Sequence, residues 1–437
     1  MLRGKDMRAY SPISMTVTIA VVIFLVPTYL SARVDFAGGT GEPNDPYQIA
    51  TAGQLISIGA DPNLLDKSFI LIADIDLDPN LPGRQIFTQA VIAPNTDTAD
   101  RFQGPAFTGS FDGNGHTVNG LTIQAPAMGW LGFFGFVGEG GRVRHLGLKD
   151  VHVTGLFNTG GLAGGNQGTI EDCYATGAVI GGEDSSSLGG LVGDNWGGSI
   201  SKSYADATVI GGPRSSPLGG LVGWNIGNIT DCHATGNVTG GEGSWGLGGL
   251  AGFAAWGKTT EPSMVVKCHA KGDVSGASGS FYLGGLVGLC GNGPVRSCCA
   301  MGNVSAGDGA SYLGGLVGLN GEPGDSLDSY GNTICRSYAT GDVSCGQMSH
   351  SIGGLAGGNV SGTITNCCAR GLVQSDEASA AIGGLVGDNG VQTALTDLGR
   401  NTIANCYASG AVSVAPDCDK VGGLLGFSRL TCITASF

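Results

Sequence analysis

A short block, Gly-Gly-Leu, recurs along most of the chain and constrains the fold more than any other feature. Its leucines are Leu162, Leu191, Leu221, Leu250, Leu286, Leu316, Leu355, Leu385 and Leu424. A degenerate copy, Gly132–Gly135, precedes the first of them by one repeat. Self-similarity at such a period indicates an array of stacked structural units, none of which buries its apolar face alone.

A second block follows each leucine and is rigid in length. Its members are an Ile or Val, a Cys or Ser three residues later, and a Val six residues further on, as at Ile170, Cys173 and Val179. The step from this Val to the next Gly-Gly-Leu leucine is always 12 residues, whereas the step from leucine to Ile varies from 8 to 18. Strands stacked in register cannot gain a residue, but an outward loop can. The rigid stretches therefore predict strands, and the variable step predicts loops on one side.

The local pattern agrees with short strands. Leu221-Val222 is an apolar pair bounded by glycine, as in a small buried strand, and the segment 229–234 alternates as a half-buried strand does. No helical period appears after the N-terminal segment. We expect an all-β fold, a parallel β-helix or β-solenoid of about ten coils with an N-terminal cap. The general preference for right-handed crossovers predicts a right-handed one.

The repeat resembles a known family. Gly-Gly-Leu-Val-Gly-x-Asn, followed by Gly-x-Ile-x-x-Cys-Tyr-Ala-Thr-Gly, is similar to the GLUG-motif repeat of bacterial surface and secreted proteins, from about Gly132 to the C-terminus. Coil four departs from it at Ala254 and over 264–266. The resemblance implies a β-solenoid displayed outside the cell, with no defined ligand. Some immunoglobulin A-cleaving proteases carry similar repeats, but their zinc-binding His-Glu-x-x-His motif does not occur in this sequence.

The chain before the repeats divides into two parts. Residues 1–32 combine basic residues with an apolar run and small residues, which predicts a signal peptide or, alternatively, an uncleaved membrane anchor. Residues 33–131 are read as an N-terminal cap and first coils, ahead of the repeat solenoid over 132–437. The segment 107–118 has the turn chemistry of a tight reversal between strands. Only eleven residues follow Gly426, so the chain is either shortened there or ends on a strand that covers the last coil.

The composition excludes several classes of protein. Glycine accounts for 82 of 437 residues without a collagen period, and charged residues for 13%. A net charge of −14 with only 21 Lys and Arg gives no footprint for nucleic acid and no polybasic patch for lipid. Contact with a membrane is expected only through the N-terminal segment, if it is uncleaved.

Three columns of equivalent residues are candidates for chemistry. The first holds cysteine in six coils and serine in two, at Cys173, Ser203, Cys232, Cys268, Cys298, Ser337, Cys367 and Cys406. Neighbours are close enough for disulfides, but a small, weakly polar buried residue explains the serines as well. The next residue is Tyr, His or Cys, which predicts either rings stacked between coils or an aromatic binding stripe. Because Cys232 and His233 would face opposite sides of a strand, they do not predict a metal site.

The third column is asparagine, at Asn166, Asn195, Asn225, Asn320, Asn359 and Asn389. It predicts either left-handed turn residues or an amide ladder between coils. Separately, Asp74, Asp76 and Asp78 have the spacing of a calcium loop, although positions six and twelve are Pro79 and Gln85; strand alternation explains the carboxylates equally well.

No column collects carboxylates or bases as a β-helix enzyme would; Asp194 and Asp388 match in position but lie six coils apart. We therefore predict no catalytic, cofactor-binding or metal-binding residues, with calcium at Asp74–Asp78 as the one alternative. The predicted role is extracellular or cell-surface adhesion, ligand binding or structure, with a glycan or surface protein as partner. The contact surface is expected on the longer loops, 254–264, 320–333 and 389–402. The alternative is a β-helix polysaccharide lyase or hydrolase.

Overall fold

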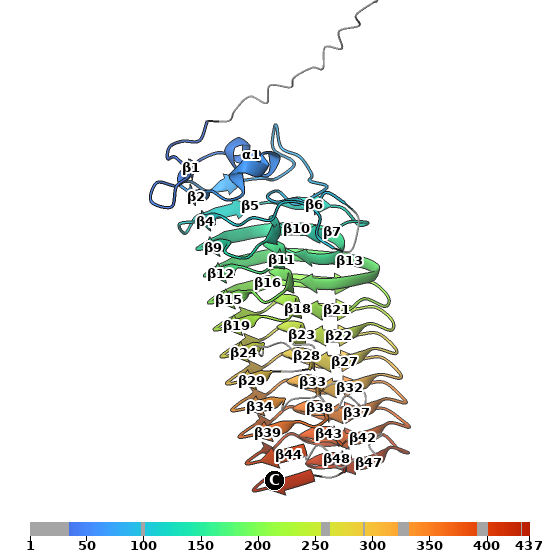
Figure 1. Ribbon diagram of the computed structural model, residues 1–437. Coiled ribbons are helices and arrows are strands. Elements are labelled where there is room, and N and C mark those ends of the chain that lie inside the picture. Colours follow the sequence, from blue (N-terminus) through green and yellow to red (C-terminus); the bar gives the residue numbers. More distant parts are fainter. Residues whose placement is uncertain are drawn as a thin grey trace, which may run out of the picture. The chain divides into compact units, whose positions relative to one another are not determined.

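The computed structural model describes residues 35–97, 101–254, 263–291, 293–321, 332–390, 401–429 and 431–437. In these residues the chain winds into stacked coils, and each coil passes through three parallel sheets (Figure 1). The predicted β-solenoid with an N-terminal cap is confirmed. The predicted signal peptide or anchor, and most of the three long loops, lie outside the described residues. No described helix combines the length and the apolar character needed to cross a bilayer.

The first and last sheets contain at most one short strand from each coil, thirteen in the first sheet and ten in the last among the described residues. The first sheet runs through β1 (Tyr47–Ile49), β2 (Ser68–Leu71), β4 (Ser110–Asp112), β9 (Arg142–Arg144), β12 (Thr169–Glu171), β15 (Ser199–Ser201), β19 (Asn228–Thr230), β24 (Met264–Val266), β29 (Pro294–Arg296), β34 (Thr333–Cys335), β39 (Thr363–Thr365), β44 (Asn401–Ala404) and β49 (Thr431–Thr434). The last sheet runs through β8 (Phe134–Val137), β11 (Ala163–Asn166), β14 (Val192–Asn195), β18 (Val222–Asn225), β23 (Ala251–Ala254), β28 (Val287–Cys290), β33 (Val317–Asn320), β38 (Ala356–Asn359), β43 (Val386–Asn389) and β48 (Leu425–Ser428).

The middle sheet lies between them along each coil. Its early strands are β3 (Ile75–Asp76), β5 (Thr117–Asn119), β6 (Thr122–Gln124), β7 (Gly129–Leu131), β10 (Gly147–Gly160), β13 (Tyr174–Gly189), β16 (Tyr204–Gly211) and β17 (Leu218–Gly219). In later coils three short strands replace each long one: β20 (His233–Ala234), β21 (Val238–Gly240), β22 (Trp245–Gly248), β25 (His269–Ala270), β26 (Val274–Gly276), β27 (Phe281–Gly284), β30 (Cys299–Ala300), β31 (Val304–Ala306), β32 (Ser311–Gly314), β35 (Tyr338–Ala339), β36 (Val343–Cys345), β37 (His350–Gly353), β40 (Cys368–Ala369), β41 (Val373–Ser375), β42 (Ala380–Gly383), β45 (Tyr407–Ala408), β46 (Val412–Val414) and β47 (Asp419–Gly422).

Stacking in register explains the rigid spacing of the repeat. Each strand pairs in parallel with its counterpart one coil away, so that Ile200 pairs with Ile229 and Val209 with Val238. The Ile, Cys, Ala and Gly-Gly-Leu leucine columns fill one continuous core, and the Val179 and Leu188 columns fill a second. Each fully buried leucine or isoleucine contributes about 2 kcal/mol of transfer free energy. The repeated apolar residues are therefore the scaffold of the stack.

In the inner coils, the two glycines before the repeat leucine are required by space. A Cβ on Gly219 would lie 1.9 Å from the carbonyl oxygen of Val222, and one on Gly220 would lie 2.1 Å from the carbonyl oxygen of Gly249 in the next coil. Both distances are far below van der Waals contact, and in both cases the obstacle is backbone. The Gly-Gly pair thus lets the chain fold back onto the last sheet while neighbouring coils stay at strand spacing.

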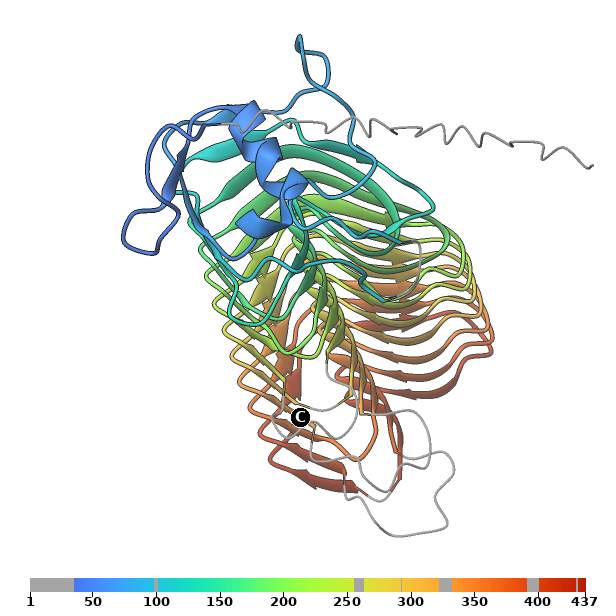
Figure 2. The same ribbon diagram turned by 45° about the horizontal axis from the view of Figure 1, so that its top comes forward.

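The N-terminal cap contains a helix, which the sequence reading missed. Helix α1 (Ala52–Ala60) lies across the end of the first coils (Figure 2), and a 3-10 turn, Pro62–Leu64, follows it. Thr51 and Gln54 form a capping box, in which Gln54 N–H donates to Thr51 Oγ1 and Thr51 N–H to Gln54 Oε1. Leu55 and Ile58 are fully buried in the main core. The expectation of no helix after the N-terminal segment is therefore wrong. The helix has only nine residues, which is too short to give a clear 3.6-residue period in the sequence.

Two predicted strand arrangements are also wrong. Segment 229–234 is not one strand, because Asp231 has a φ of 54° and makes a corner between β19 and β20. The Asp-Gly-Asn-Gly turn over 112–115 does not make a hairpin: β4 pairs with β2 and β9 in the first sheet, while β5 pairs with β3 and β10 in the middle sheet. The turn chemistry is present in both places, but it joins sheets rather than paired strands.

Candidate functional site

The cysteine column binds one coil to the next. The Cys232 thiol donates to the carbonyl oxygen of Thr230 at 3.2 Å, and its sulfur accepts the backbone N–H of Ser203 from the preceding coil at 3.4 Å. Ser337 makes the same two bonds through Oγ, to Cys335 O at 2.9 Å and from Cys298 N–H at 3.1 Å. The position requires a small side chain that can both donate and accept a hydrogen bond. Cysteine and serine both meet this requirement, which explains why one replaces the other.

The pKa values of the cysteine thiols are shifted in both directions in the part of the chain that the structure describes: contact with Cys268 lowers those of Cys232 and Cys298, and contact with Cys367 lowers that of Cys406. None of them is joined in a disulfide there. Burial raises the pKa of the Cys173 thiol to about 12, and does the same for Cys290. Cys232 points into the core while His233 lies on the outer side, as strand alternation predicts. No three His, Cys, Asp or Glu side chains of the described residues are grouped to hold a metal ion.

The asparagine column forms a buried amide ladder. Asn166 Nδ2 donates to Asn195 Oδ1 at 2.8 Å, and Asn195 Nδ2 donates in turn to Asn225 Oδ1 at 2.7 Å. The ladder is interrupted at Ala254 and Cys290 and resumes from Asn320 through Asn359 to Asn389, with bonds of 2.8 and 2.7 Å. None of these residues has a positive φ, so the ladder interpretation is confirmed and the turn interpretation is wrong.

The Tyr and His side chains beside the cysteine column stack on one another. The ring centroids of Tyr174 and Tyr204 are 4.8 Å apart, those of Tyr204 and His233 4.8 Å, and those of His233 and His269 4.7 Å, with interplanar angles of at most 8°. Within this run of four rings the stacked faces cover each other, so the inner rings, Tyr204 and His233, leave only their edges for a ligand. Stacking between coils, the simpler of the two predictions, is therefore what this column does.

The three aspartates over 74–78 serve the local backbone. Asp74 accepts hydrogen bonds from Thr117 N–H at 2.9 Å and from His116 Nδ1 at 3.1 Å, which hold the pKa of its carboxyl below the usual value. Asp76 accepts the N–H of Asp78, and Asp78 accepts the N–H of Asn80. Ile75 and Leu77 between them are buried, so the alternation of a strand accounts for the D-x-D-x-D pattern.

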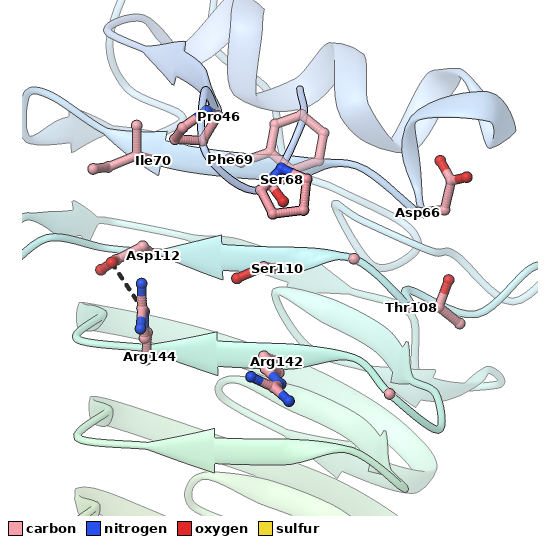
Figure 3. Close-up of a pocket in the computed structure, with 13 residues that line it drawn as sticks. Pro46, Asp66, Ser68, Phe69, Ile70, Thr108, Ser110, Asp112, Arg142 and Arg144 are labelled. Carbon is pink, nitrogen blue, oxygen red and sulfur yellow. Dashed lines mark hydrogen bonds and ion pairs between the residues drawn. The ribbon is translucent and has the colours of Figure 1, made fainter. Parts of the chain in front are cut away.

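A shallow pocket of about 480 Å³ lies on the first sheet near the N-terminal end (Figure 3). Ser68, Ser110 and Arg142 are paired on successive strands β2, β4 and β9 and give it a polar floor. Arg144 Nε donates to Asp112 at 3.0 Å. Burial opposes ionisation of Asp112, but bonds from Asn114 N–H and His145, together with Arg144, keep the pKa of its carboxyl low. The pocket therefore presents hydroxyls, the exposed guanidinium groups of Arg142 and Arg144, and the carboxylates of Asp66 and Asp112.

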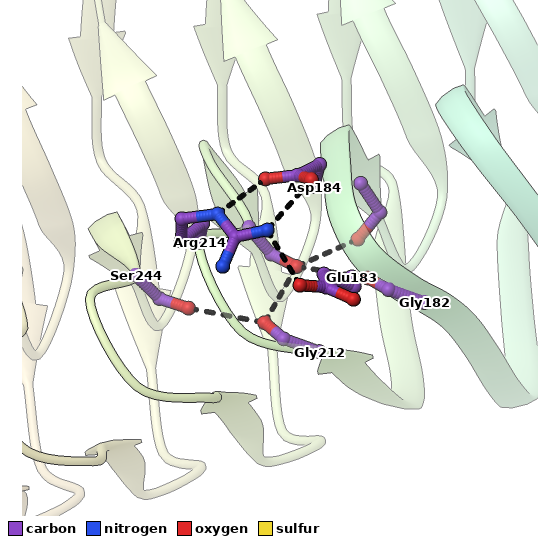
Figure 4. Close-up of polar contacts among 8 residues, drawn as sticks. Gly182, Glu183, Asp184, Gly212, Arg214 and Ser244 are labelled. Carbon is purple, nitrogen blue, oxygen red and sulfur yellow. Dashed lines mark hydrogen bonds and ion pairs between the residues drawn. The ribbon is translucent and has the colours of Figure 1, made fainter.

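A second pocket, of about 430 Å³, opens on the outer side of the middle and last sheets, and we call it the Asp194 pocket. Its lining residues come from four strands and the turn after β14: Leu156, Phe157, Asn158, Asp184, Ser186, Ser187, Asp194, Trp196 and Trp224. At its edge, Arg214 forms ion pairs with Glu183 and Asp184 (Figure 4), with an Nε–Oδ1 distance of 2.8 Å to Asp184. The hydrogen bonds from Arg214 lower the pKa of Asp184.

Asp194 is the most unusual group in this pocket. Its side chain is 7% exposed, and its Oδ1 atom is buried without a hydrogen-bond partner among the described residues. Burial alone raises the pKa of its carboxyl to about 7. Trp196, two residues on, is 57% exposed, and Trp224 pairs with Asp194 from the next coil. The sequence reading noted Asp194 only as a match to Asp388; the available signal was its place three residues after the Gly-Gly-Leu leucine.

Comparison with known proteins identifies the repeat. Residues 155–180, 184–210 and 217–239 match the GLUG motif. A crystal structure from Bacteroides ovatus, described as that of an immunoglobulin A1 protease, covers 87% of this chain and 87% of its own at 18% identity. Its TM-score is 0.36, and at that value the similarity supports no statement about this chain.

Two curated relatives share part of the sequence. Halomucin of Haloquadratum walsbyi is 34% identical over 157 residues, and a protein of Evansella cellulosilytica whose name describes a Gly-rich membrane protein is 35% identical over 146 residues. These matches cover 36% and 31% of this chain, but only 2% and 15% of the relatives. With its three motif matches and its stacked coils, this chain is a β-solenoid that contains GLUG-motif repeats.

Proposed function

We propose that this chain is an exported, non-catalytic repeat protein of the cell envelope or exterior, whose outer surface binds a ligand such as a glycan or surface protein. One observation carries the proposal: the repeated polar columns are used between coils. The cysteine column bridges backbone groups, the asparagine column forms an amide ladder, and the Tyr and His rings stack. Repetition thus serves the scaffold, and what differs from coil to coil is the outward surface.

The relatives support the location in part. One of them is named for a membrane, and the basic and apolar N-terminal segment of this chain is typical of an exported protein. Because this chain spans only a small share of either relative, their roles are not transferred to it. The ligand class comes instead from the chemistry of this chain's own surface.

One observation favours the alternative of a carbohydrate-active enzyme. Asp184 and Asp194 line the same pocket, and their pKa values are shifted in opposite directions, as in a pair of one carboxylate and one carboxylic acid. Against this, Asp184 is bound by Arg214, which favours a structural use of its carboxylate. An assay for reducing ends released from a panel of polysaccharides separates the two proposals.

The direct test is a glycan-array and whole-cell binding screen on purified protein, with and without calcium. Saturable binding by folded protein, without release of reducing ends, is the expected result. Folded protein that binds no glycan and no cell, but assembles with itself, would replace the proposal with a purely structural role. Folded protein that degrades a polysaccharide would replace it with the enzymatic one.

A further inference from the structure

The Asp194 pocket has a counterpart six coils away, and the groups that occupy this second pocket indicate which kind of ligand the first could bind. A pocket of about 350 Å³ is lined by Asp388, which occupies the strand position of Asp194, and by Phe427, which occupies the position of Trp224. In each pair the aromatic residue lies opposite the aspartate on the strand of the next coil. The solenoid therefore builds the same aspartate–aromatic pair twice.

The chain fills the second pocket with its own cations. Lys420 Nζ lies 4.9 Å from the centre of the Phe427 ring, and the Arg429 guanidinium lies 5.1 Å from it. Both cations line the pocket with Asp388, so that a carboxyl, an aromatic face and a positive charge meet. These distances lie within the range at which a cation is attracted to an aromatic ring.

At the Asp194 pocket the chain supplies no such cation from the same positions. The residues equivalent to Lys420 and Arg429 are Pro217 and Ile226. The described lining holds no lysine, and the nearby Arg214 is engaged by Glu183 and Asp184 at the edge. The buried Oδ1 of Asp194 has no hydrogen-bond partner among the residues that the structure describes, and the exposed ring of Trp196 lines the same pocket.

We propose that the Asp194 pocket binds a primary ammonium group carried by an external ligand, with Asp194 as its counter-charge and with Trp224, the counterpart of Phe427, and the exposed Trp196 as its aromatic walls. This inference rests on the proposed ligand-binding function and names the chemistry of one ligand. Lysine side chains of a surface protein and amino sugars both carry this group. The experiment below distinguishes these two sources of the ammonium group by using a separate probe for each.

The proposal has a pH dependence with a definite sign. Only ionised Asp194 pairs with a cation, and its pKa near 7 leaves about a tenth of the sites ionised at pH 6 and about nine tenths at pH 8. Affinity should therefore fall about tenfold from pH 8 to pH 6. Asp184 is the other titratable group of the lining; its pKa is lowered, so it stays ionised across this range. Phe157 and Asn158 of β10 and Trp224 of β18 do not titrate.

The experiment is a calorimetric titration of the full chain with n-butylammonium at pH 6 and pH 8, with n-butanol as the neutral control. Nα-acetyl-lysine amide and glucosamine then represent the two sources of the group. Asp194→Asn should weaken n-butylammonium binding at pH 8 at least tenfold and remove the pH dependence. Trp196→Ala should weaken it about threefold to fivefold. Asp388→Asn, the matched control at the equivalent position, should leave it unchanged.

A second variant tests the comparison with the Asp388 pocket, in which the chain supplies its own cation. Ile226→Arg places a guanidinium where Arg429 stands beside the second pocket, so it should block n-butylammonium binding in a protein that remains folded. Equal binding of n-butanol, or loss of binding in Asp388→Asn but not in Asp194→Asn, would overturn the proposal. So would binding of methyl pyranosides without ammonium binding.

Failure of this site and failure of the proposed function give different results. If Asp194→Asn binds cells or glycans as the unmodified protein does, and if n-butylammonium binds neither of the two proteins, the site is refuted and the function stands. If n-butylammonium binds through Asp194 but the protein recognises no cell or glycan, the site stands and the function is refuted.

Discussion

Replacing Asn195 by alanine tests the amide ladder where it is continuous. The Asn195 side chain accepts from Asn166 Nδ2 at 2.8 Å and donates to Asn225 Oδ1 at 2.7 Å and to Gly198 O at 3.2 Å. The two acceptors keep other partners, the N–H groups of Gly227 and Asn228, but the fully buried Asn166 loses Asn195 Oδ1 as the acceptor of its amide N–H. One orphaned donor and two further lost bonds amount to about 3 kcal/mol.

Asn320→Ala is the matched control at the end of a ladder. Asn320 donates to Asn359 Oδ1 at 2.8 Å, but its own Oδ1 faces Cys290 in the preceding coil and has no hydrogen-bond partner. Its removal exchanges one orphaned oxygen for another, so the expected loss is about 1 kcal/mol. Urea denaturation followed by far-UV circular dichroism, with hydrogen exchange to localise the effect, measures both. Equal losses in the two variants would refute the ladder as a chain of cooperating bonds.

The remaining predictions concern the repeat glycines, the gap in the ladder and the buried carboxyl. Gly220→Ala should prevent stable stacking or lower the free energy of unfolding by more than about 3 kcal/mol, whereas Gly182→Ala, whose Cβ meets nothing within 4 Å, should change it by less than about 1 kcal/mol. Cys290→Asn supplies the donor that Asn320 Oδ1 lacks and should raise the denaturation midpoint, by about 1 kcal/mol of stability. Burial raises the pKa of Asp194 in the folded protein to about 7, whereas its value in the unfolded chain is near 4. The free energy of unfolding should therefore fall as the pH rises from 4 through 7. Asp194→Asn should remove this dependence, so the free energy of unfolding should rise by up to about 4 kcal/mol at pH 8 and stay unchanged at pH 4. No gain at pH 8 would contradict an ionised, desolvated carboxyl.

The parts of the fold that repeat were predictable, because stacking imposes the same demand on every coil. Constant spacing identified the strands, and the asparagine positions identified a ladder that the structure confirms. The exchange of Cys232 for Ser203 in one column indicated a small polar buried side chain, and both make the same bonds. Because every coil must meet the same stacking requirement, the same spacing and residue types recur many times within a single chain and can be compared with one another.

The features that occur once or depend on backbone conformation were not predictable. The corner at Asp231 falls on a non-glycine residue with positive φ, and its counterparts range from Asp172 and Asn366 to Lys202 and Arg336, so no single side-chain chemistry marks it. Helix α1 is too short to show a period, and the turn at 112–115 has the same residues whether or not its flanking strands pair. Each of these depends on tertiary packing rather than on a local pattern.

The candidate site was missed for a related reason. The repeat relates Asp194 to Asp388 by position, but the structure is needed to place Trp224 and Phe427 opposite them in the next coil. The pocket that buries Asp194 includes residues of neighbouring coils, such as Asn158 of the preceding coil and Trp224 of the next, and their proximity depends on the stacking. The predicted contact surface on the long loops stays a prediction, since most of those residues lie outside the described part of the chain.

The most direct test of the account is the binding of purified, folded protein to glycans and whole cells, measured to saturation alongside a reducing-end assay. The account predicts saturable binding to at least one ligand with no polysaccharide degraded, because the repeated columns hold the coils together and the varying outer surface meets the ligand. Folded protein that binds nothing, or that releases reducing ends, would contradict it.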